Sequence, residues 1–146
     1  EAQVVVERVQ VLGGVEEACT ELGSERRDLC LLGAGWFTSQ VVWGSPEWPL
    51  GACESLSTEQ DREGCWRGPG FHAADHLHPT PQRLRRQIER APPERRTAVA
   101  RGAGYLLGRT YSSEELAQAL CAELGEPLVA DCYVGIGDAR RHSVER

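Results

Sequence analysis

The sequence predicts an all-α protein made of α/α helical-hairpin repeats, each about 34 residues long and stacked as a short right-handed solenoid. The first observation is a Gly-x-Gly motif that occurs four times, beginning at Gly33, Gly68, Gly102 and Gly135, with spacings of 35, 34 and 33 residues. The second is a set of six cysteines that fall into three pairs. Three of the four motif copies follow such a pair. Internal repetition at this period is typical of stacked supersecondary units.

Length and composition indicate a single globular domain spanning residues 1–146. Apolar residues make up 40% of the chain and charged residues 26%, and no apolar run approaches the roughly 18–20 residues of a membrane span. All 16 basic residues are arginine, a bias that fits a GC-rich bacterial genome. The chain begins at Glu1 and contains no Met, which indicates a mature form whose targeting segment has been removed. The net charge of −6 favours neither nucleic acid nor acidic membranes as a partner.

The cysteine spacing predicts three disulfides within the hairpins. The paired residues are Cys19 and Cys30, Cys53 and Cys65, and Cys121 and Cys132, with separations of 11, 12 and 11. The third copy of the motif has Val99 in place of the second cysteine, and Gln87 or Ile88 in place of the first. Both cysteines are therefore missing together, as a disulfide partnership predicts and as independent thiols or metal ligands do not. None of the pairs has the C-x-x-C spacing of a redox motif or a zinc knuckle.

The chain must turn back between the two cysteines of each pair. On one helix, a separation of 11 residues would place the two sulfurs about 16 Å apart, whereas a disulfide requires Cα atoms within about 7 Å. Turn signals lie midway in each copy, at Gly23-Ser24, Ser57-Thr58, Pro92-Pro93 and Gly125-Glu126-Pro127. Each unit is therefore predicted to be a helix, a tight turn and a second, antiparallel helix.

The predicted units cover residues 14–43, 50–78, 80–110 and 112–142. Their first helices are expected over 14–22, 50–56, 81–91 and 113–124, and their second helices over 25–42, 58–77, 93–110 and 127–142. Start signals support several of these boundaries. They are Thr80 before Pro81, a capping box of Ser57 with Gln60, Ser112 with Glu115, and prolines suited to the first helical position at Pro93 and Pro127.

We interpret the repeated glycines as sites of helix–helix contact. A glycine inside a helix costs about 1 kcal/mol relative to alanine, so the eight motif glycines require a compensating function. Removal of the Cβ lets a neighbouring helix approach closely, and each nearby disulfide offsets part of the cost by about 2–4 kcal/mol. A dinucleotide-binding loop is the alternative for Gly33 and Gly35. It requires a preceding strand and a third glycine where this chain has Thr38.

The run GAGYLLGRTY at residues 102–111 resembles the small–aromatic helix signature of tetratricopeptide-like α/α repeats, whose period is similar. With its paired cysteines, the chain is more similar in style to a disulfide-stapled, cysteine-rich bacterial variant of such repeats. The resemblance covers residues 14–142 at the level of period and helix pairing. It implies a scaffold that binds a protein or peptide, with no catalytic residues and no cofactor.

A histidine-rich segment at residues 71–78, FHAADHLH, suggests a metal site. His72 and His76 are four residues apart and share one helix face. Two such imidazoles could bind zinc, with Asp75 or His78 completing the shell. The alternative is that three histidines near a helix end, just before Pro79, are simply exposed to solvent. The chain has no H-E-x-x-H pattern, so a catalytic metal is not expected.

Residues 83–101 contain seven arginines and two glutamates, a local charge of +5 against −11 for the rest of the chain. Arg83, Arg86 and Arg90 are candidates for contacting an anionic partner through their guanidinium groups. The alternative is a solvated face paired with acidic neighbours. No aromatic residue interleaves with these arginines, so nucleic acid is not expected. Trp43 and Trp48, in the segment WGSPEWPL, form a second candidate partner surface, or else cover the core.

We do not expect an enzyme from this sequence. The serines at the predicted turns resemble helix caps without a surrounding nucleophile motif, and paired cysteines cannot act as nucleophiles. The leading hypothesis is a periplasmic or secreted bacterial scaffold that binds a protein or peptide. A metal-binding protein that uses the His72 and His76 helix face is the main alternative, and a structural module of a larger envelope protein is a third. The chain is also expected either to belong to a longer repeat array or to self-associate through its edges.

Overall fold

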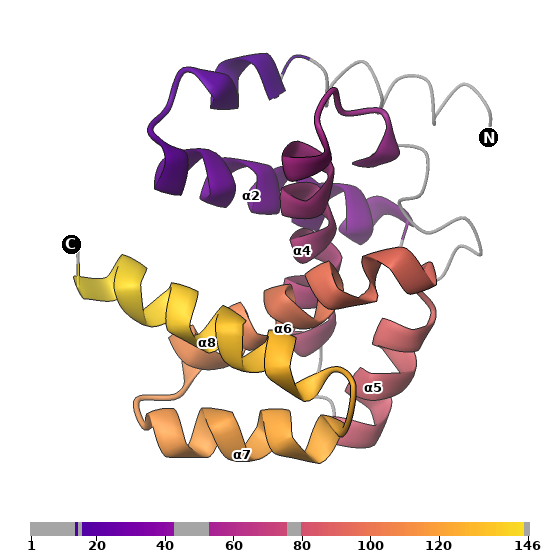
Figure 1. Ribbon diagram of the computed structural model, residues 1–146, viewed down its shortest axis with the longest axis vertical. Coiled ribbons are helices and arrows are strands. Elements are labelled where there is room, and N and C mark those ends of the chain that lie inside the picture. The colour runs from indigo at the N-terminus through magenta and orange to yellow at the C-terminus, as the bar shows by residue number, and fades with distance from the viewer. Residues whose placement is uncertain (1–13, 15, 43–52, 76–79, 145–146) are drawn as a thin grey trace. The chain divides into compact units, whose positions relative to one another are not determined.

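The structure, a computed structural model, describes residues 14, 16–42, 53–75 and 80–144, and every regular element in these residues is helical (Figure 1). The elements are α2 (Ser24–Val42), α4 (Glu59–Asp75), α5 (Pro81–Glu89), the 3₁₀ turn η1 (Pro93–Arg95), α6 (Arg96–Thr110), α7 (Glu114–Leu124) and α8 (Val129–Val144). Residues 16–20 and 53–54 are also helical. The all-α prediction is therefore confirmed. In this part of the chain, no helix has the length and apolar character needed to cross a membrane.

The chain divides into two compact units, Glu1–Pro69 and Gly70–Arg146, and the division falls inside α4. In the first unit, α2 follows a short helix and packs against the N-terminal part of α4. Leu31 and Trp66, at 1% and 0% exposed, belong to its core. In the second unit, α5 is followed by α6 and α7 by α8, and α6 packs extensively against α8.

Three disulfides close the predicted hairpins. The bonds join Cys19 to Cys30, Cys53 to Cys65 and Cys121 to Cys132, with Cα–Cα distances of 5.8, 5.6 and 5.6 Å. This pairing is the predicted one, and it leaves no free thiol. The hairpin of α5 and α6 lacks a disulfide and has Ile88 and Val99 instead. Both side chains are fully buried, so an apolar pair takes the place of the covalent link.

The helix caps agree with prediction at α5 and differ by one residue at α4 and α7. Thr80 caps α5, since its hydroxyl accepts a hydrogen bond of 3.3 Å from a backbone N–H three residues further along. At α7 the cap is Ser113 rather than Ser112. At α4 the capping hydroxyl is that of Thr58 rather than Ser57. Ser57 bonds instead to a glutamate on the preceding helix.

Two second helices begin later than predicted. In the segment predicted as a helix over 93–110, the first three residues form η1, and α6 begins at Arg96. Two consecutive prolines remove two backbone donors, which favours a short 3₁₀ turn at this point. The helix predicted over 127–142 begins at Val129. Gly125, with a φ of 77°, ends α7, and Pro127 lies in the turn rather than at the first helical position.

Close backbone contacts at glycines join the two second helices of the first unit. A Cβ atom on Gly35 of α2 would lie 1.8 Å from the carbonyl oxygen of Cys65 in α4. A Cβ atom on Gly68 of α4 would lie 2.1 Å from the backbone nitrogen of Trp36. Both distances are far below van der Waals contact, so only glycine fits at these positions. The two helices therefore touch through their backbones.

The same kind of contact recurs in the second unit. A Cβ on Gly70, Gly104 or Gly135 would lie 1.8–1.9 Å from a carbonyl oxygen of the facing helix. The facing residues are Val99, Cys132 and Arg101, respectively. The interpretation of the glycines as helix–helix contacts is confirmed at these positions. At Gly33 and Gly137, the first and last glycines of the series, a Cβ would meet no described atom within 4 Å.

The mass of the intact chain tests the disulfides. We expect the mass to rise by that of six hydrogens when a reductant is added, because all six cysteines are bonded. Replacing Cys121 and Cys132 together by serine should lower the free energy of unfolding by about 2–4 kcal/mol. Electrospray mass spectrometry and urea unfolding measure the two effects. Six thiols that react with an alkylating agent before reduction would rule the disulfides out.

Alanine at two corresponding glycines should change stability in opposite directions. Gly104→Ala places a Cβ 1.9 Å from the Cys132 carbonyl oxygen. The two helices must then move apart, and we expect a loss of about 3 kcal/mol in the free energy of unfolding. In Gly137→Ala the added Cβ meets no described atom within 4 Å, and the higher helix propensity of alanine should add up to about 1 kcal/mol to the free energy of unfolding. Urea unfolding at low protein concentration measures both values, and effects of the same sign and size would contradict the contact at Gly104.

Candidate functional site

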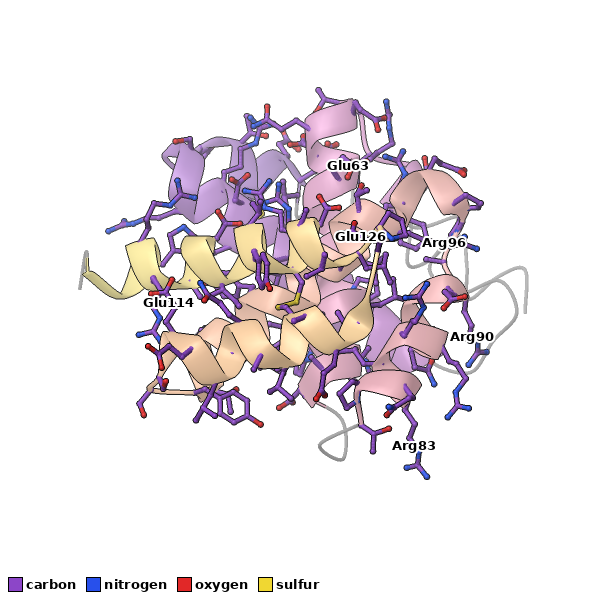
Figure 2. All side chains as sticks on the ribbon, turned by 60° about the horizontal axis from the view of Figure 1, so that its bottom comes forward. Glu63, Arg83, Arg90, Arg96, Glu114 and Glu126 are labelled. Atoms are coloured by element: carbon purple, nitrogen blue, oxygen red, sulfur yellow. A yellow bond between two sulfur atoms is a disulfide. The ribbon has the colours of Figure 1, made fainter. Side chains whose placement is uncertain are left out.

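Helix α5 carries an arginine-rich surface because its two sides differ in character. Leu84 and Ile88, one helical turn apart, are 5% and 0% exposed and face the core. Arg83, Arg86 and Arg90 are exposed, and their spacing of three and four residues places them on a common side. Figure 2 shows Arg83 and Arg90 extending away from the ribbon. We call Arg83, Arg86 and Arg90 the α5 arginine face.

Other arginines of residues 83–101 are used inside the fold. Arg85 donates hydrogen bonds to the main-chain carbonyls of Leu124 and Glu126, just where α7 ends. A positive charge at that position also interacts favourably with the helix dipole. Arg96 donates to two main-chain carbonyls at the end of α5, and Arg101 forms an ion pair with an aspartate of α8. These side chains stabilise the fold and are not free to bind a partner.

The α5 arginine face has few polar partners within the described part of the chain. There, Arg83 and Arg86 form no side-chain hydrogen bond or ion pair. Arg90 donates to the side chain of Gln87 at 3.4 Å, which is a long and neutral contact. No described acidic side chain neutralises the face. Its guanidinium groups therefore keep donors available for the carboxylates or phosphates of a ligand.

Helix α5 also contributes to the wall of an apolar pocket in the second unit. Its wall includes Leu84 of α5, Leu106 and Leu107 of α6, and Leu120 of α7, with Asp75 of α4 contributing polar atoms. Leu84 follows Arg83 directly in the sequence, but its side chain faces the core while that of Arg83 is exposed. The pocket was not predicted from the sequence, since an apolar residue at helical spacing gives the same pattern whether it fills a core or lines a gap.

Of the predicted metal ligands, the structure describes His72 and Asp75. His72 lies in α4 and is 9% exposed, while Asp75 ends the same helix and lines the pocket. His76, Trp43 and Trp48 lie outside the described residues. Inside them, no group of three His, Cys, Asp or Glu side chains could hold a metal ion. The metal site and the tryptophan surface therefore stay predictions.

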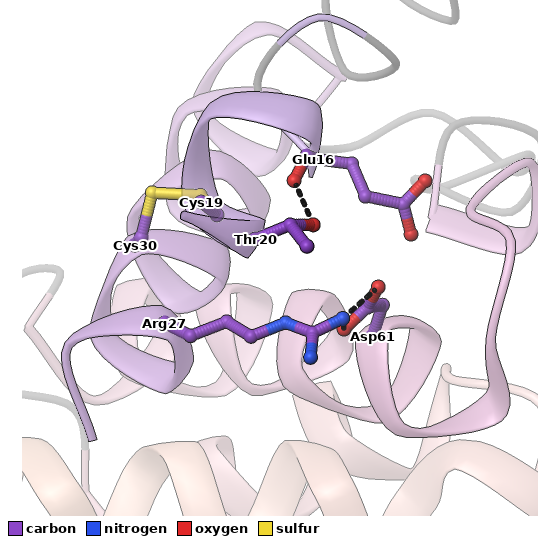
Figure 3. The surroundings of a disulfide bond; sticks show 6 residues. All are labelled: Glu16, Cys19, Thr20, Arg27, Cys30 and Asp61. Atoms are coloured by element: carbon purple, nitrogen blue, oxygen red, sulfur yellow. Dashed lines mark hydrogen bonds and ion pairs between the residues drawn. A yellow bond between two sulfur atoms is a disulfide. The ribbon is translucent and has the colours of Figure 1, made fainter. Parts of the chain in front are cut away.

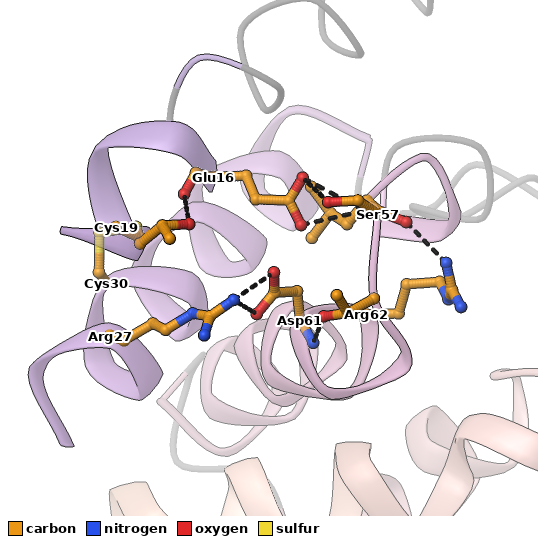
Figure 4. A network of polar contacts seen from close by, with 10 residues as sticks. Glu16, Cys19, Arg27, Cys30, Ser57, Asp61 and Arg62 are labelled. Atoms are coloured by element: carbon orange, nitrogen blue, oxygen red, sulfur yellow. Dashed lines mark hydrogen bonds and ion pairs between the residues drawn. A yellow bond between two sulfur atoms is a disulfide. The ribbon is translucent and has the colours of Figure 1, made fainter. Parts of the chain in front are cut away.

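A partly buried polar cluster connects the helices of the first unit (Figure 3 and Figure 4). Arg27 of α2 places its Nη2 atom 2.7 and 2.8 Å from the two carboxylate oxygens of Asp61 in α4, a residue only 1% exposed. Glu16, on the preceding helix, accepts hydrogen bonds from the Ser57 hydroxyl at 2.7 Å and from the Ser57 N–H at 3.0 Å. The cluster lies beside the disulfide of Cys19 and ties three segments of the unit together.

The ionisation of Asp61 fits a structural role. Burial by itself raises the pKa of its carboxyl group, but hydrogen bonding with Glu16, the hydrogen bond and charge of Arg27, and a hydrogen bond with Thr58 together lower it below its ordinary value. The group is therefore a carboxylate at neutral pH. A carboxyl group that acts as an acid or base near pH 7 needs a raised pKa, so we interpret this cluster as a stabilising one.

A second buried aspartate, Asp138 of α8, binds two arginines. Arg101 of α6 donates to both of its oxygens, at 2.6 and 3.0 Å, and Arg141 donates to one of them. The side chain is 6% exposed, and a carboxylate at this depth requires such partners. The sequence contains one sign that Asp138 has an unusual role. Asp138 follows the last Gly-x-Gly, where the other copies have an aromatic residue, as with Tyr105.

Comparison with known proteins found no match. No family model, no curated protein and no solved structure matches this chain. The tetratricopeptide-like resemblance therefore stays an expectation from the sequence, and the candidate site depends on the geometry of α5 and its pocket.

Replacing Asp61 by asparagine should destabilise the fold mainly above about pH 4. Because the pKa of Asp61 is lowered in the folded state, the carboxylate contributes stability above its unfolded-state pKa of about 3.9. That contribution is lost as the pH falls through the folded-state pKa. We expect Asp61→Asn to lower the free energy of unfolding by about 3 kcal/mol at neutral pH and by much less in strong acid.

Urea unfolding monitored by circular dichroism at the two pH values measures this difference. Glu17→Gln, at an exposed carboxylate of the same unit, is the matched control and should change little at either pH. A loss for Asp61→Asn that is equal at both pH values would show that the charge of Asp61 is not what stabilises the cluster.

Proposed function

We propose that this chain is a non-enzymatic repeat scaffold that binds an acidic segment of a partner protein or peptide through the α5 arginine face. The observation that carries the proposal is the contrast between the arginines of residues 83–101. Arg85, Arg96 and Arg101 bond within the fold, whereas Arg83 and Arg86 keep their guanidinium groups exposed. Neighbouring guanidinium groups can bind carboxylates through paired, charge-assisted hydrogen bonds.

The pocket that α5 helps to line favours a peptide over a free anion. Four leucines, among them Leu84 and Leu120, contribute to its wall, and such side chains are suited to contact an apolar residue. A peptide that inserts one apolar residue there can extend acidic residues along α5. Apolar contacts would then contribute affinity, and the arginines would contribute orientation and a preference for acidic sequences.

The proposed solenoid is supported by the regular order of the glycine contacts. Gly35, Gly70 and Gly104 are each the second glycine of a motif. Each meets a main-chain carbonyl of the next second helix, at the residue three positions before the next Gly-x-Gly, which is a cysteine in two cases and Val99 in the third. Together with the sequence period of about 34 residues, this order supports hairpins stacked in series, in which each unit contacts its neighbours.

The proposed location is the periplasm or the extracellular space of a bacterium. Three disulfides support an oxidising compartment, because most cytosolic proteins keep their thiols reduced. Arginine as the sole basic residue type supports a GC-rich bacterial source. Stability from covalent links would suit a scaffold that operates outside the cytosol.

A fluorescent peptide in which one leucine is flanked by glutamates tests the arginine face. We expect it to bind the wild-type chain, and to bind Arg83→Gln/Arg86→Gln at least about tenfold more weakly. The double variant loses charge-assisted hydrogen bonds, each worth about 1.5–3 kcal/mol. Fluorescence anisotropy measures the dissociation constants, which should also rise with salt because these contacts are exposed to screening.

The control variant is Arg26→Gln/Arg109→Gln, which removes the same charge from exposed arginines of α2 and α6. It should bind the peptide as the wild-type chain does. A peptide with glutamine in place of glutamate should bind weakly to all three proteins. Equal affinities for the two double variants would mean that net charge alone attracts the peptide, and the proposal would then be wrong.

A further inference from the structure

The contact between α6 and α8 is made by two different kinds of helix face. On α6 it uses the second glycine of a motif, Gly104, where a Cβ would lie 1.9 Å from the Cys132 carbonyl oxygen. On α8 it uses the first glycine of a motif, Gly135, where a Cβ would lie 1.9 Å from the Arg101 carbonyl oxygen. The contact between α2 and α4 pairs its glycines in the same way. We call the side of a helix that carries the first glycine of its motif the first-glycine face, and the side that carries the second glycine the second-glycine face. Each such contact therefore joins the second-glycine face of one helix to the first-glycine face of the next.

Helix α8 has a second-glycine face of its own that no described residue covers. A Cβ on Gly137 would meet no described atom within 4 Å. Tyr133 and Val134, about one turn earlier, are 41% and 47% exposed. Residues three and four positions apart on a helix share a face, so these two apolar side chains flank Gly137. On α6, the residue that corresponds to Val134 is Arg101, which contacts α8.

Helix α2 has an uncovered face of the complementary kind. A Cβ added to Gly33, the first glycine of its motif, would also meet no described atom within 4 Å. Phe37, one turn later, is 57% exposed. On α8, the residue that corresponds to Phe37 is Ala139, which is 1% exposed because α6 covers it. Within the described residues, one face of each kind is therefore uncovered, with Tyr133 and Val134 exposed on α8 and Phe37 on α2.

We propose that copies of this chain associate head to tail, with α8 of one copy packed on α2 of the next in the register of the α6–α8 contact. In that register, Gly137 meets the carbonyl of Cys30, as Gly104 meets that of Cys132. The occupant of each free face is thus the other free face of an identical chain. The known contact supplies both the spacing and the glycine pairing.

Side chains at the matching positions are compatible with this register. The α6–α8 contact contains the ion pair of Arg101 with Asp138. At the same place, the docked helices bring together Val134 and Trp36, two apolar side chains. An aspartate facing valine would instead leave a buried charge unpaired. The docked helices bury no unpaired charge at this position, which is compatible with a second copy as the occupant.

Sedimentation velocity over a range of concentrations tests the proposal. The two faces differ, so each added copy leaves one free face at either end, and the wild-type chain should form dimers and then larger species. Gly33→Ala and Gly137→Ala should each be monomeric, because the added Cβ would strike the backbone of the partner copy. An added Cβ at either position meets no described atom within 4 Å and alanine favours a helix, so circular dichroism should show an intact fold.

A mixture of Gly33→Ala and Gly137→Ala should form dimers and no larger species, since each variant keeps the one face that the other lacks. A wild-type chain that stays monomeric up to the highest soluble concentration would overturn the proposal. So would unchanged association of either variant, and a loss confined to Gly137→Ala would indicate α8 pairing with itself. Arg83→Gln/Arg86→Gln should associate like the wild-type chain, which separates this result from peptide binding.

Discussion

Backbone contact between glycine-bearing helices is the constraint on which the rest of this structure depends. At Gly35, Gly70 and Gly104 no side chain separates the helix from the carbonyl of its neighbour. Glycines weaken a helix by about 1 kcal/mol each, and a disulfide contributes about 2–4 kcal/mol. Cys65 and Cys132 supply the very carbonyls that two of these glycines meet. In these two hairpins, the disulfide therefore also anchors the residue whose carbonyl makes the helix contact.

The features that recur in the sequence were predictable, and those that occur once were not. Paired cysteines and Gly-x-Gly motifs at a fixed period predicted both the disulfides and the helix contacts, because each needs only a few residue types at a set spacing. Ser57 failed as the predicted cap of α4 because it bonds to Glu16, 41 residues away, leaving the cap to Thr58. The exposed arginines could not be separated from Arg85 without knowing where α7 ends, and the pocket beside Leu84 required the packing of several helices.

Two surfaces of different chemistry follow from this architecture. The α5 arginine face lies on a first helix, in the hairpin where Ile88 and Val99 replace a disulfide. The free glycine faces lie on second helices, where Gly33 and Gly137 have no described neighbour. The proposed binding and the proposed association therefore use residues of different helices, α5 for the first and α2 and α8 for the second.

Nuclear Overhauser effects from glycine Hα protons measure the central contact most directly. In the disulfide-bonded chain we expect cross-peaks between the Hα protons of Gly104 and Cys132, and between those of Gly35 and Cys65. The Cβ positions of these glycines lie 3.0 and 3.2 Å from the facing Cα atoms, so the protons that occupy those positions are close to the neighbouring helix. If both pairs lack a cross-peak in the folded protein, side chains separate the helices, and backbone contact does not organise this fold.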